Sequence, residues 1–427
     1  MDDLSPVFGK VADVVVCGFA MIVGRFLAWA QGVSAGERAE GASALARAYL
    51  YADLLDDDRR DAAVVLTTLL DDGSPVVRRA LSEAFASAED APHHIIVALA
   101  NDQSDVSAPV LGRSPLLSDA DLIDCAAVGD AFAQSAIALR PNLSAAVAAA
   151  LAEVGAREAL ISLAVNGGAD LPEFSMRRMI ERFGDDGEMR EALLSRPYLP
   201  PTLRADLVTA TARALSAFVT ACEWMSGERA ERATREAREK ATIMISADTG
   251  ARTQNGPLAL VRHLRKCGQL TAGLVLRSLL SGHRALFEAA LAELSGLPPE
   301  RVAGHVRAYR HSGFAAVYAR AKLPAGLFPA FQAALEAAEE LGAPMGDGAE
   351  AALSRTMIER VLTACSAFGS AEIGQLMALL RRFQAEAARE EARVMSAQLA
   401  EREEQSRKAM VIEIDFESLE AELLEAA

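Results

Sequence analysis

Leu143-Ser144, Leu171-Pro172 and Leu199-Pro200 are three copies of one pattern, in which an apolar residue precedes Ser, Thr or Pro and then a helix-forming run. The same pattern occurs at Ala91-Pro92, Leu117-Ser118, Leu270-Thr271, Leu297-Pro298 and Leu323-Pro324. Within each of the two series, successive copies are 26 to 28 residues apart. A fixed period of this length is typical of stacked helical repeats. We therefore predict an all-α fold, an α-solenoid of short helical hairpins.

The second residue of the pattern is suited to starting a helix. Ser118 fits an N-cap, and Asp121 follows three residues later as a capping-box partner. Leu117 and Leu122 occupy the positions of a hydrophobic staple, which sets the entry angle of the chain. Pro172 and Pro200 fit the first helical turn, where proline costs no hydrogen bond. The pattern thus predicts architecture rather than a binding site.

Arginine precedes several copies of the pattern, at Arg113, Arg140 and Arg196. These side chains could hydrogen-bond the acidic turns of the neighbouring repeat, or they could line a binding face. We favour the internal role, because stacked repeats must satisfy the polar groups of their turns.

Two further stretches indicate a family. Residues 72–81, Asp-Gly-Ser-Pro-Val-Val-Arg-Arg-Ala-Leu, resemble the inner helix of a HEAT-like repeat. Together with residues 45–50, Leu-Ala-Arg-Ala-Tyr-Leu, and the Arg-Pro-x-Leu units that begin at Arg140 and Arg196, they make residues 21–340 similar to an uncharacterised bacterial family, domain of unknown function 2336. The resemblance implies a HEAT/armadillo-like α-solenoid and assigns no activity. The period of about 27 residues is shorter than that of ordinary HEAT repeats.

Changes in composition divide the chain into six expected segments. Glu228 to Lys240 is dense in charges of both signs, which favours a solvated, salt-bridged helix over a basic helix that binds in a groove. Ser246 to Pro257 contains several turn-forming residues and is expected to be an exposed loop. The six segments are an apolar extension or first helix (1–35), a repeat array (36–224), a charged helix and hinge loop (225–257), a second repeat segment (258–368), a long heptad-like helix (369–408) and an acidic tail (409–427).

The C-terminal segments offer two candidate contacts. The apolar residues of the long helix follow 3-4 spacing, which fits a helix that caps the solenoid or a coiled-coil seam that forms a homodimer. These residues are Ile373, Leu376, Leu380, Phe383, Ala387, Val394 and Ala397. In the tail, Ile412, Ile414 and Phe416 alternate with acidic residues, a strand-like period. The tail is either a docking peptide for a partner or a self-packed terminus.

Net charge and hydropathy limit the kinds of partner. The formal charge of −16 opposes binding to nucleic acid and to anionic membranes, and leaves a basic or neutral protein partner open. Residues 11–30 are apolar but interrupted by Asp13 and Arg25, and are too short to span a bilayer. We expect no membrane contact, with association through residues 11–30 as a minor alternative.

The five cysteines are scattered and include no CxxC pair, which fits buried free thiols in a reducing cytoplasm. The chain has no phosphate-binding loop, nucleophile elbow or HExxH motif. We therefore predict no catalytic residue, no cofactor and no metal. The best candidate for contact with an anionic group is a basic-aromatic cluster of Arg301, Arg307, Tyr309 and Arg310.

The expected function is a non-catalytic cytoplasmic scaffold or regulator that binds a protein partner. The alternatives are an enzyme on a HEAT-like scaffold, such as a lyase or a nucleic-acid repair glycosylase, and a membrane-associated adaptor that uses residues 11–30.

Overall fold

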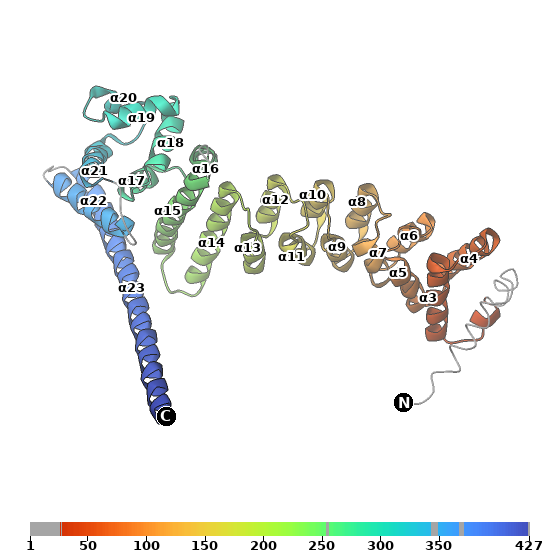
Figure 1. Ribbon diagram of the computed structural model, residues 1–427. Helices are drawn as coiled ribbons and strands as arrows, with labels where there is room; N and C mark the ends of the chain where they lie inside the picture. Colours follow the sequence, from red (N-terminus) through yellow and green to blue (C-terminus); the bar gives the residue numbers. More distant parts are fainter. Residues whose placement is uncertain (1–25, 27, 253–255, 343–348, 367–370, 426–427) are drawn as a thin grey trace. The chain divides into compact units, whose positions relative to one another are not determined.

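The computed structural model describes residues 26, 28–252, 256–342, 349–366 and 371–425 (Figure 1). Of residues 249–252, 349–352, 366, 371–373, 375 and 409–425, only the backbone is described. The described residues are mostly helical and include no β-strand, only an isolated parallel bridge between Leu143 and Ala169. The predicted all-α fold is therefore confirmed. The chain divides into two compact units, residues 1–227 and 228–427, called unit 1 and unit 2 below.

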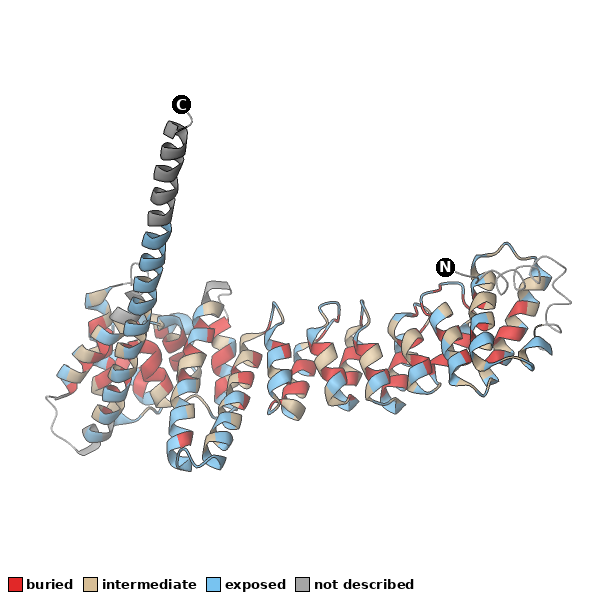
Figure 2. Ribbon diagram, turned by 90° about the horizontal axis from the view of Figure 1, so that it is seen from below, coloured by how far each residue is buried: buried red, intermediate tan, exposed pale blue. Residues whose placement is uncertain are grey.

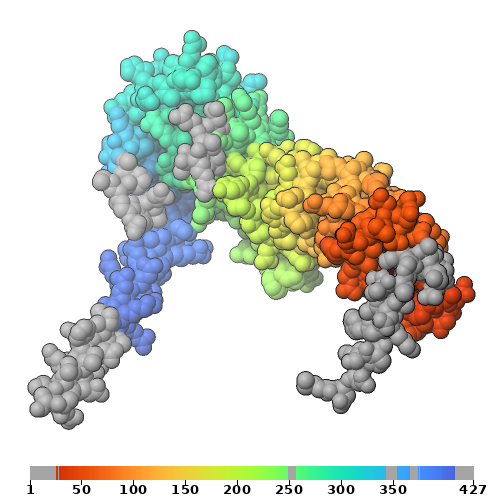
Figure 3. All heavy atoms as spheres, turned by 45° about the vertical axis from the view of Figure 1, so that its right-hand side comes forward, coloured from red at the N-terminus to blue at the C-terminus, as the bar shows by residue number. Residues whose placement is uncertain are grey.

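Unit 1 is a stacked array in which alternate helices pack against each other (Figure 1). Its segments follow one another in chain order, from red to yellow-green in Figure 3. One row consists of α3 (Ala35–Tyr51), α5 (Pro75–Phe85), α7 (Ser104–Arg113), α9 (Ala131–Ala138), α11 (Arg157–Val165) and α13 (Gly187–Leu194). The other consists of α8 (Asp119–Val128), α10 (Ala145–Val154), α12 (Glu173–Phe183) and α14 (Pro201–Ala221). Near the start of the array lie α4 (Asp56–Thr68), the 3-10 turn η2 (Leu69–Asp71) and α6 (His93–Ala100).

The repeated apolar-Ser/Pro pairs start the helices of the second row. Ser118 caps α8 through the predicted capping box with Asp121, and Ser144 caps α10. Pro172 and Pro200 lie at the N-cap positions of α12 and α14, one residue before the predicted first turn. The preceding leucines are all buried, so each pair both starts a helix and contributes to the core. Figure 2 shows buried residues in red along the helices of unit 1.

Adjacent repeats also meet through their backbones. The amide of Leu143 donates to the carbonyl of Gly168 at 3.4 Å, and the amide of Asp170 donates to the carbonyl of Leu143 at 2.9 Å. A Cβ on Gly168 would lie 1.8 Å from the carbonyl oxygen of Pro141. Only glycine therefore allows the two turns to approach this closely.

Unit 2 has a core richer in aromatic residues. Phe287 stacks on Phe331 with ring centroids 5.9 Å apart, and Tyr318 lies edge-on to Phe331 at 5.3 Å. Its elements are α15 (Gly227–Arg252), α16 (Gly256–Lys266), α17 (Ala272–Leu280), α18 (Arg284–Ser295), α19 (Pro299–Arg307), α20 (Ser312–Arg320), η3 (Ala325–Leu327), α21 (Phe328–Leu341), α22 (Ala349–Ser366) and α23 (Ala371–Glu425).

The loop predicted at Ser246–Pro257 is wrong over most of its length. Helix α15 continues to Arg252 and α16 starts at Gly256, while residues 253–255 lie outside the described part. Ile243 and Ile245, just before the predicted loop, are buried. Burial of this apolar face within unit 2 outweighs the local preference of Asp248 and Gly250 for a turn.

The predicted long C-terminal helix is present, but it extends through the predicted acidic tail to Glu425. The strand-like period predicted for the tail is therefore wrong: once a helix is established, each further residue adds one hydrogen bond at little extra cost. Four heptad positions, Leu376, Leu380, Phe383 and Ala387, are buried within unit 2. This part of the heptad caps its own unit. Farther along, Val394 is half-buried and Ala397 is exposed.

The prediction that the cysteines are buried is confirmed for two of the four described cysteines. Cys125 and Cys365 are buried, as predicted, and burial raises the pKa of both thiols, whereas Cys222 and Cys267 are exposed.

The proposed membrane contact at residues 11–30 falls mostly on residues 11–25 and 27, which lie outside the described part. Within the described part, no helix combines the length and apolar character needed to cross a membrane.

Candidate partner-binding surfaces

The arginines that precede the repeated pairs bind backbone carbonyls of the previous repeat. The guanidinium of Arg140 donates to the carbonyls of Leu111 and Ser114, at 2.6 and 2.7 Å. Arg196 repeats this arrangement, donating to the carbonyls of Ala164, Asn166 and Ala169 at 3.0 to 3.2 Å.

These carbonyls lie at or just beyond the C-terminal ends of α7 and α11, where the last turn of a helix lacks internal donors. Desolvation by burial lowers the pKa of both Arg140 and Arg196. The predicted internal role is confirmed for these two residues, although the acceptors are carbonyls rather than carboxylates. Arg113, the third predicted member, is exposed.

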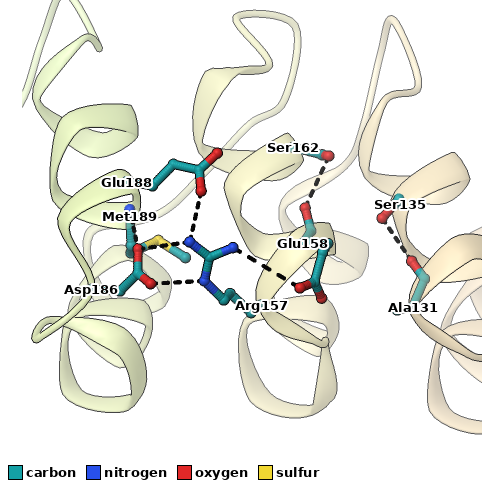
Figure 4. A network of polar contacts seen from close by, with 8 residues as sticks. All are labelled: Ala131, Ser135, Arg157, Glu158, Ser162, Asp186, Glu188 and Met189. Atoms are coloured by element: carbon teal, nitrogen blue, oxygen red, sulfur yellow. Dashed lines mark hydrogen bonds and ion pairs between the residues drawn. The ribbon is translucent and has the colours of Figure 1, made fainter.

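A second set of arginines, which the sequence reasoning missed, pairs with aspartates of the following repeat. Arg157 at the start of α11 binds the carboxylate of Asp186 through Nε at 2.7 Å, and its Nη2 binds Glu188 at 2.6 Å (Figure 4). The same carboxylate accepts a hydrogen bond from the amide of Met189, and so caps α13. The hydrogen bond from Arg157, followed by that from the amide of Met189, lowers the pKa of Asp186 to about 2.

Two earlier pairs follow the same scheme. Arg38 binds Asp72 at 2.8 Å, and Arg78 binds Asp102 at 2.6 Å. The side chains of all four residues are mostly buried. The signal in the sequence was an arginine near the start of one helix and an aspartate in the next acidic turn, 24 to 34 residues later.

With these arginines held inside the array, carboxylates dominate the exposed charge of unit 1. Residues 28–227 contain no lysine. Several exposed acidic side chains have no ion pair with any described residue. They are Asp71, Glu89, Asp90, Asp105, Asp119, Asp124, Asp170 and Glu191.

The predicted basic-aromatic cluster does not form one exposed surface. Tyr309 is buried, and its hydroxyl donates to Glu339 of α21 at 2.8 Å. Arg310 pairs with the same carboxylate at 2.9 Å. Arg301 and Arg307 are exposed on α19. Tyr309 therefore offers little surface to a partner, and Glu339 offsets the charge of Arg310. Contact of a partner with these four residues stays a prediction.

The predicted tail contacts, Ile412, Ile414 and Phe416, belong to α23 in the stretch where only the backbone is described. Their role in binding stays a prediction.

Unit 2 contains a buried ion network that the sequence did not indicate. Arg277 of α17 donates through Nη1 to Glu386 of α23 at 2.7 Å, and its Nε lies 3.6 Å from the carboxylate of Glu239 of α15. Thr271 donates to the other oxygen of Glu239 at 3.1 Å. Burial raises the pKa of Glu239, and the charge of Arg277 opposes that shift.

The network attaches the first part of α23 to its own unit. Two more pairs lie alongside it: Lys240 with Glu390 at 2.6 Å and Glu236 with Arg382 at 3.4 Å. The charged stretch is a salt-bridged helix, as predicted, and its Arg229, Glu231 and Arg232 are exposed. It is not solvated on every side, because Glu239 is only 8% exposed and faces the network.

Comparison with known proteins found one family. The family model described as an uncharacterised protein conserved in bacteria (DUF2336) matches residues 106–371. The match begins and ends farther toward the C-terminus than the predicted resemblance over residues 21–340. Searches among curated proteins and among solved structures found no match. The match covers more than half of the chain and runs from α7 to the first residue of α23. The protein therefore belongs to the uncharacterised bacterial family DUF2336.

Proposed function

We propose that the protein is a non-catalytic cytoplasmic scaffold built on a HEAT-like repeat array, and that unit 1 binds a protein partner with a basic surface. One observation carries the proposal: unit 1 uses several of its arginines to bind the carbonyls and aspartates of adjacent repeats, and most of its exposed charged side chains are carboxylates. The internal bonds keep the repeats in register, and the exposed charge favours a partner of opposite sign.

The choice of arginine supports this division of roles. A guanidinium presents a planar set of donors and can bind two or three acceptors at once, whereas a lysine ammonium is a compact charge on a flexible stem. Arg196 contacts three carbonyls in this way. The array is thus held together by cations that are largely withdrawn from solvent.

Cross-linking in the native bacterium would test the proposal. Amine-reactive reagents would miss residues 28–227, which contain no lysine, so the reagent should be a carboxyl-reactive dihydrazide. We expect cross-links between unit 1 and specific partners whose recovery falls as salt rises, since exposed charges are screened.

A pair of matched variants makes the test specific. Each replaces three exposed carboxylates by amides, so that both change the net charge equally. The first is Asp105→Asn/Asp119→Asn/Asp124→Asn in unit 1, and the control is Glu300→Gln/Glu401→Gln/Glu403→Gln in unit 2. The first should lose the partners and the control should keep them. Equal recovery with both variants, or recovery that does not depend on salt, would contradict the proposal.

A further inference from the structure

The C-terminal end of α14, within unit 1, holds two exposed aromatic rings against each other. Phe218 is 54% exposed and Trp224 is 70% exposed. Their centroids are 5.5 Å apart and their planes meet at 88°, the edge-to-face geometry that aromatic pairs favour. Leu215 and Met225, 51% and 36% exposed, extend the apolar surface.

A specific helix cap sets this arrangement. The amide of Glu223 donates to the carbonyl of Thr220, and the amide of Trp224 donates to the carbonyl of Val219, both at 3.1 Å. These are the two bonds of a Schellman motif, in which an apolar residue after the cap packs against the last turn of the helix. Contact between Trp224 and Phe218 is that packing: the cap holds the backbone of Trp224 beside the last turn of α14, where the indole meets the ring of Phe218.

The residue at the centre of the motif is unusual. Glu223 has a φ of +58°, in the left-handed region where glycine is strongly preferred. A side chain there costs about 1–2 kcal/mol. Glycine would form the same cap without that cost. What glutamate adds is an exposed carboxylate in the same turn as the two rings, and this carboxylate has no ion pair with any described residue.

We propose that this aromatic turn, made of Leu215, Phe218, Glu223, Trp224 and Met225, is the docking point for a protein segment that presents an apolar side chain beside Lys or Arg. The inference rests on the proposed scaffold function and identifies the surface of unit 1 at which the partner docks. Large exposed aromatic residues are those that most often dominate binding energy at interfaces. The apolar side chain covers the rings, while the cation faces Glu223 and the electron-rich face of the indole.

Charge decides against a second copy of the chain as the occupant. A copy would bring another Glu223 and another acidic unit 1 to the same place, and the whole chain carries a formal charge of −16. A basic segment carries a charge opposite in sign to that of Glu223 and of the acidic unit 1, and is therefore attracted.

The chain offers a direct optical test. It has two tryptophans, so Trp29→Phe leaves Trp224 as the only indole. The probes are a helical peptide of Leu and Lys and the same peptide with Glu in place of Lys. The Lys peptide should shift the Trp224 emission to shorter wavelength in a saturable, salt-sensitive way, because binding removes the ring from water. The Glu peptide should not.

Variants distinguish docking at the turn from general attraction to an acidic protein. In the Trp29→Phe background, Phe218→Ala and Glu223→Gln should each weaken binding of the Lys peptide, Phe218→Ala by at least about tenfold. Tyr198→Ala, which removes another aromatic ring that is 86% exposed, should leave the affinity unchanged. Equal binding of both peptides, or equal loss in the Tyr198 variant, overturns the proposal.

Two further results separate this inference from the scaffold function. If sedimentation shows a wild-type dimer that Phe218→Ala converts to a monomer, the turn binds a second copy and the proposal is wrong. If the Lys peptide leaves the Trp224 emission unchanged while unit 1 still cross-links salt-sensitively to partners, the scaffold function stands and docking at this turn is wrong.

Discussion

The guanidinium of Arg277 lies over the ring of Phe383, with its central carbon 4.0 Å from the ring centroid. The two residues come from α17 and α23, and the same guanidinium also donates to Glu386. A single, almost fully buried arginine thus joins the C-terminal helix to unit 2 by a cation–π contact and by an ion pair.

Replacing this arginine should strongly destabilise unit 2. Arg277→Ala leaves Glu239 buried without its cation, and loss of one partner of a buried pair costs about 3–5 kcal/mol. Urea unfolding followed by circular dichroism would measure the change. Because Glu239 then has the uncompensated charge, Arg277→Ala/Glu239→Gln should be more stable than Arg277→Ala alone. A double variant that is no better than the single one would contradict this account.

The raised pKa of Glu239 also predicts how stability depends on pH. A carboxyl whose pKa is higher in the folded state stabilises the fold while it is protonated, and this contribution is lost as pH rises through the folded pKa. In Arg277→Ala that pKa should rise further, since the cation that opposes the shift is gone. Unfolding midpoints of this variant should fall as pH increases above about 4.5, and Glu239→Gln should flatten the curve.

The lowered pKa of Asp186 predicts the opposite dependence of stability on pH in unit 1. Its pKa falls from 3.8 to about 2, so its contribution to stability is complete above the ordinary value and is lost as pH falls toward 2. Asp186→Asn should remove part of the acid sensitivity of unit 1 between pH 4 and pH 2, measured as the urea midpoint across that range. Asp185→Asn is the control, because the ion pair of Asp185 with Arg213 joins two mostly exposed side chains. An equal effect of both variants would show that the Arg157 pair is not the cause.

The carbonyl-binding arginines should not tolerate lysine. Arg196→Lys keeps the positive charge but cannot reach three carbonyls at once, so we expect a loss of about 1–3 kcal/mol. Arg113→Lys, at the exposed member of the series, should change the unfolding free energy little. Similar losses in both variants would contradict the structural role.

The contact between adjacent turns should depend on one glycine. Gly168→Ala places a Cβ against the carbonyl oxygen of Pro141, so the backbone must shift, and we expect a loss of about 2–3 kcal/mol. Gly167→Ala is the control, because nothing lies within 4 Å of its added Cβ. Comparison of the thermal midpoints of the two variants would check this, and equal midpoints would contradict the close approach.

Features that depend on short stretches were predictable from the sequence. The capping box of Ser118 and Asp121 involves residues three apart, so the pattern indicates it directly. The internal role of Arg140 and Arg196 followed from the repeat, which places each turn next to its counterpart one period away. Their acceptors could not be identified, because helix-end carbonyls leave no mark in the sequence.

Features that depend on distant contacts were missed. Arg277 and Glu386 are 109 residues apart with no repeat to relate them, and Tyr309 reaches Glu339 across 30 residues. The aromatic turn was also missed, because Glu223 occupies the position where a glycine would have indicated a helix cap.

The sequence by itself determined where the helices start, the period at which they stack and the acidic character of the chain, because capping, helical periodicity and net charge are properties of neighbouring residues. Only the tertiary structure decided which charges are buried and which are exposed, as for Arg196 against Arg113 and Glu239 against Glu191. The physical reason is desolvation, which depends on the elements that cover a side chain and not on the residues beside it in the chain.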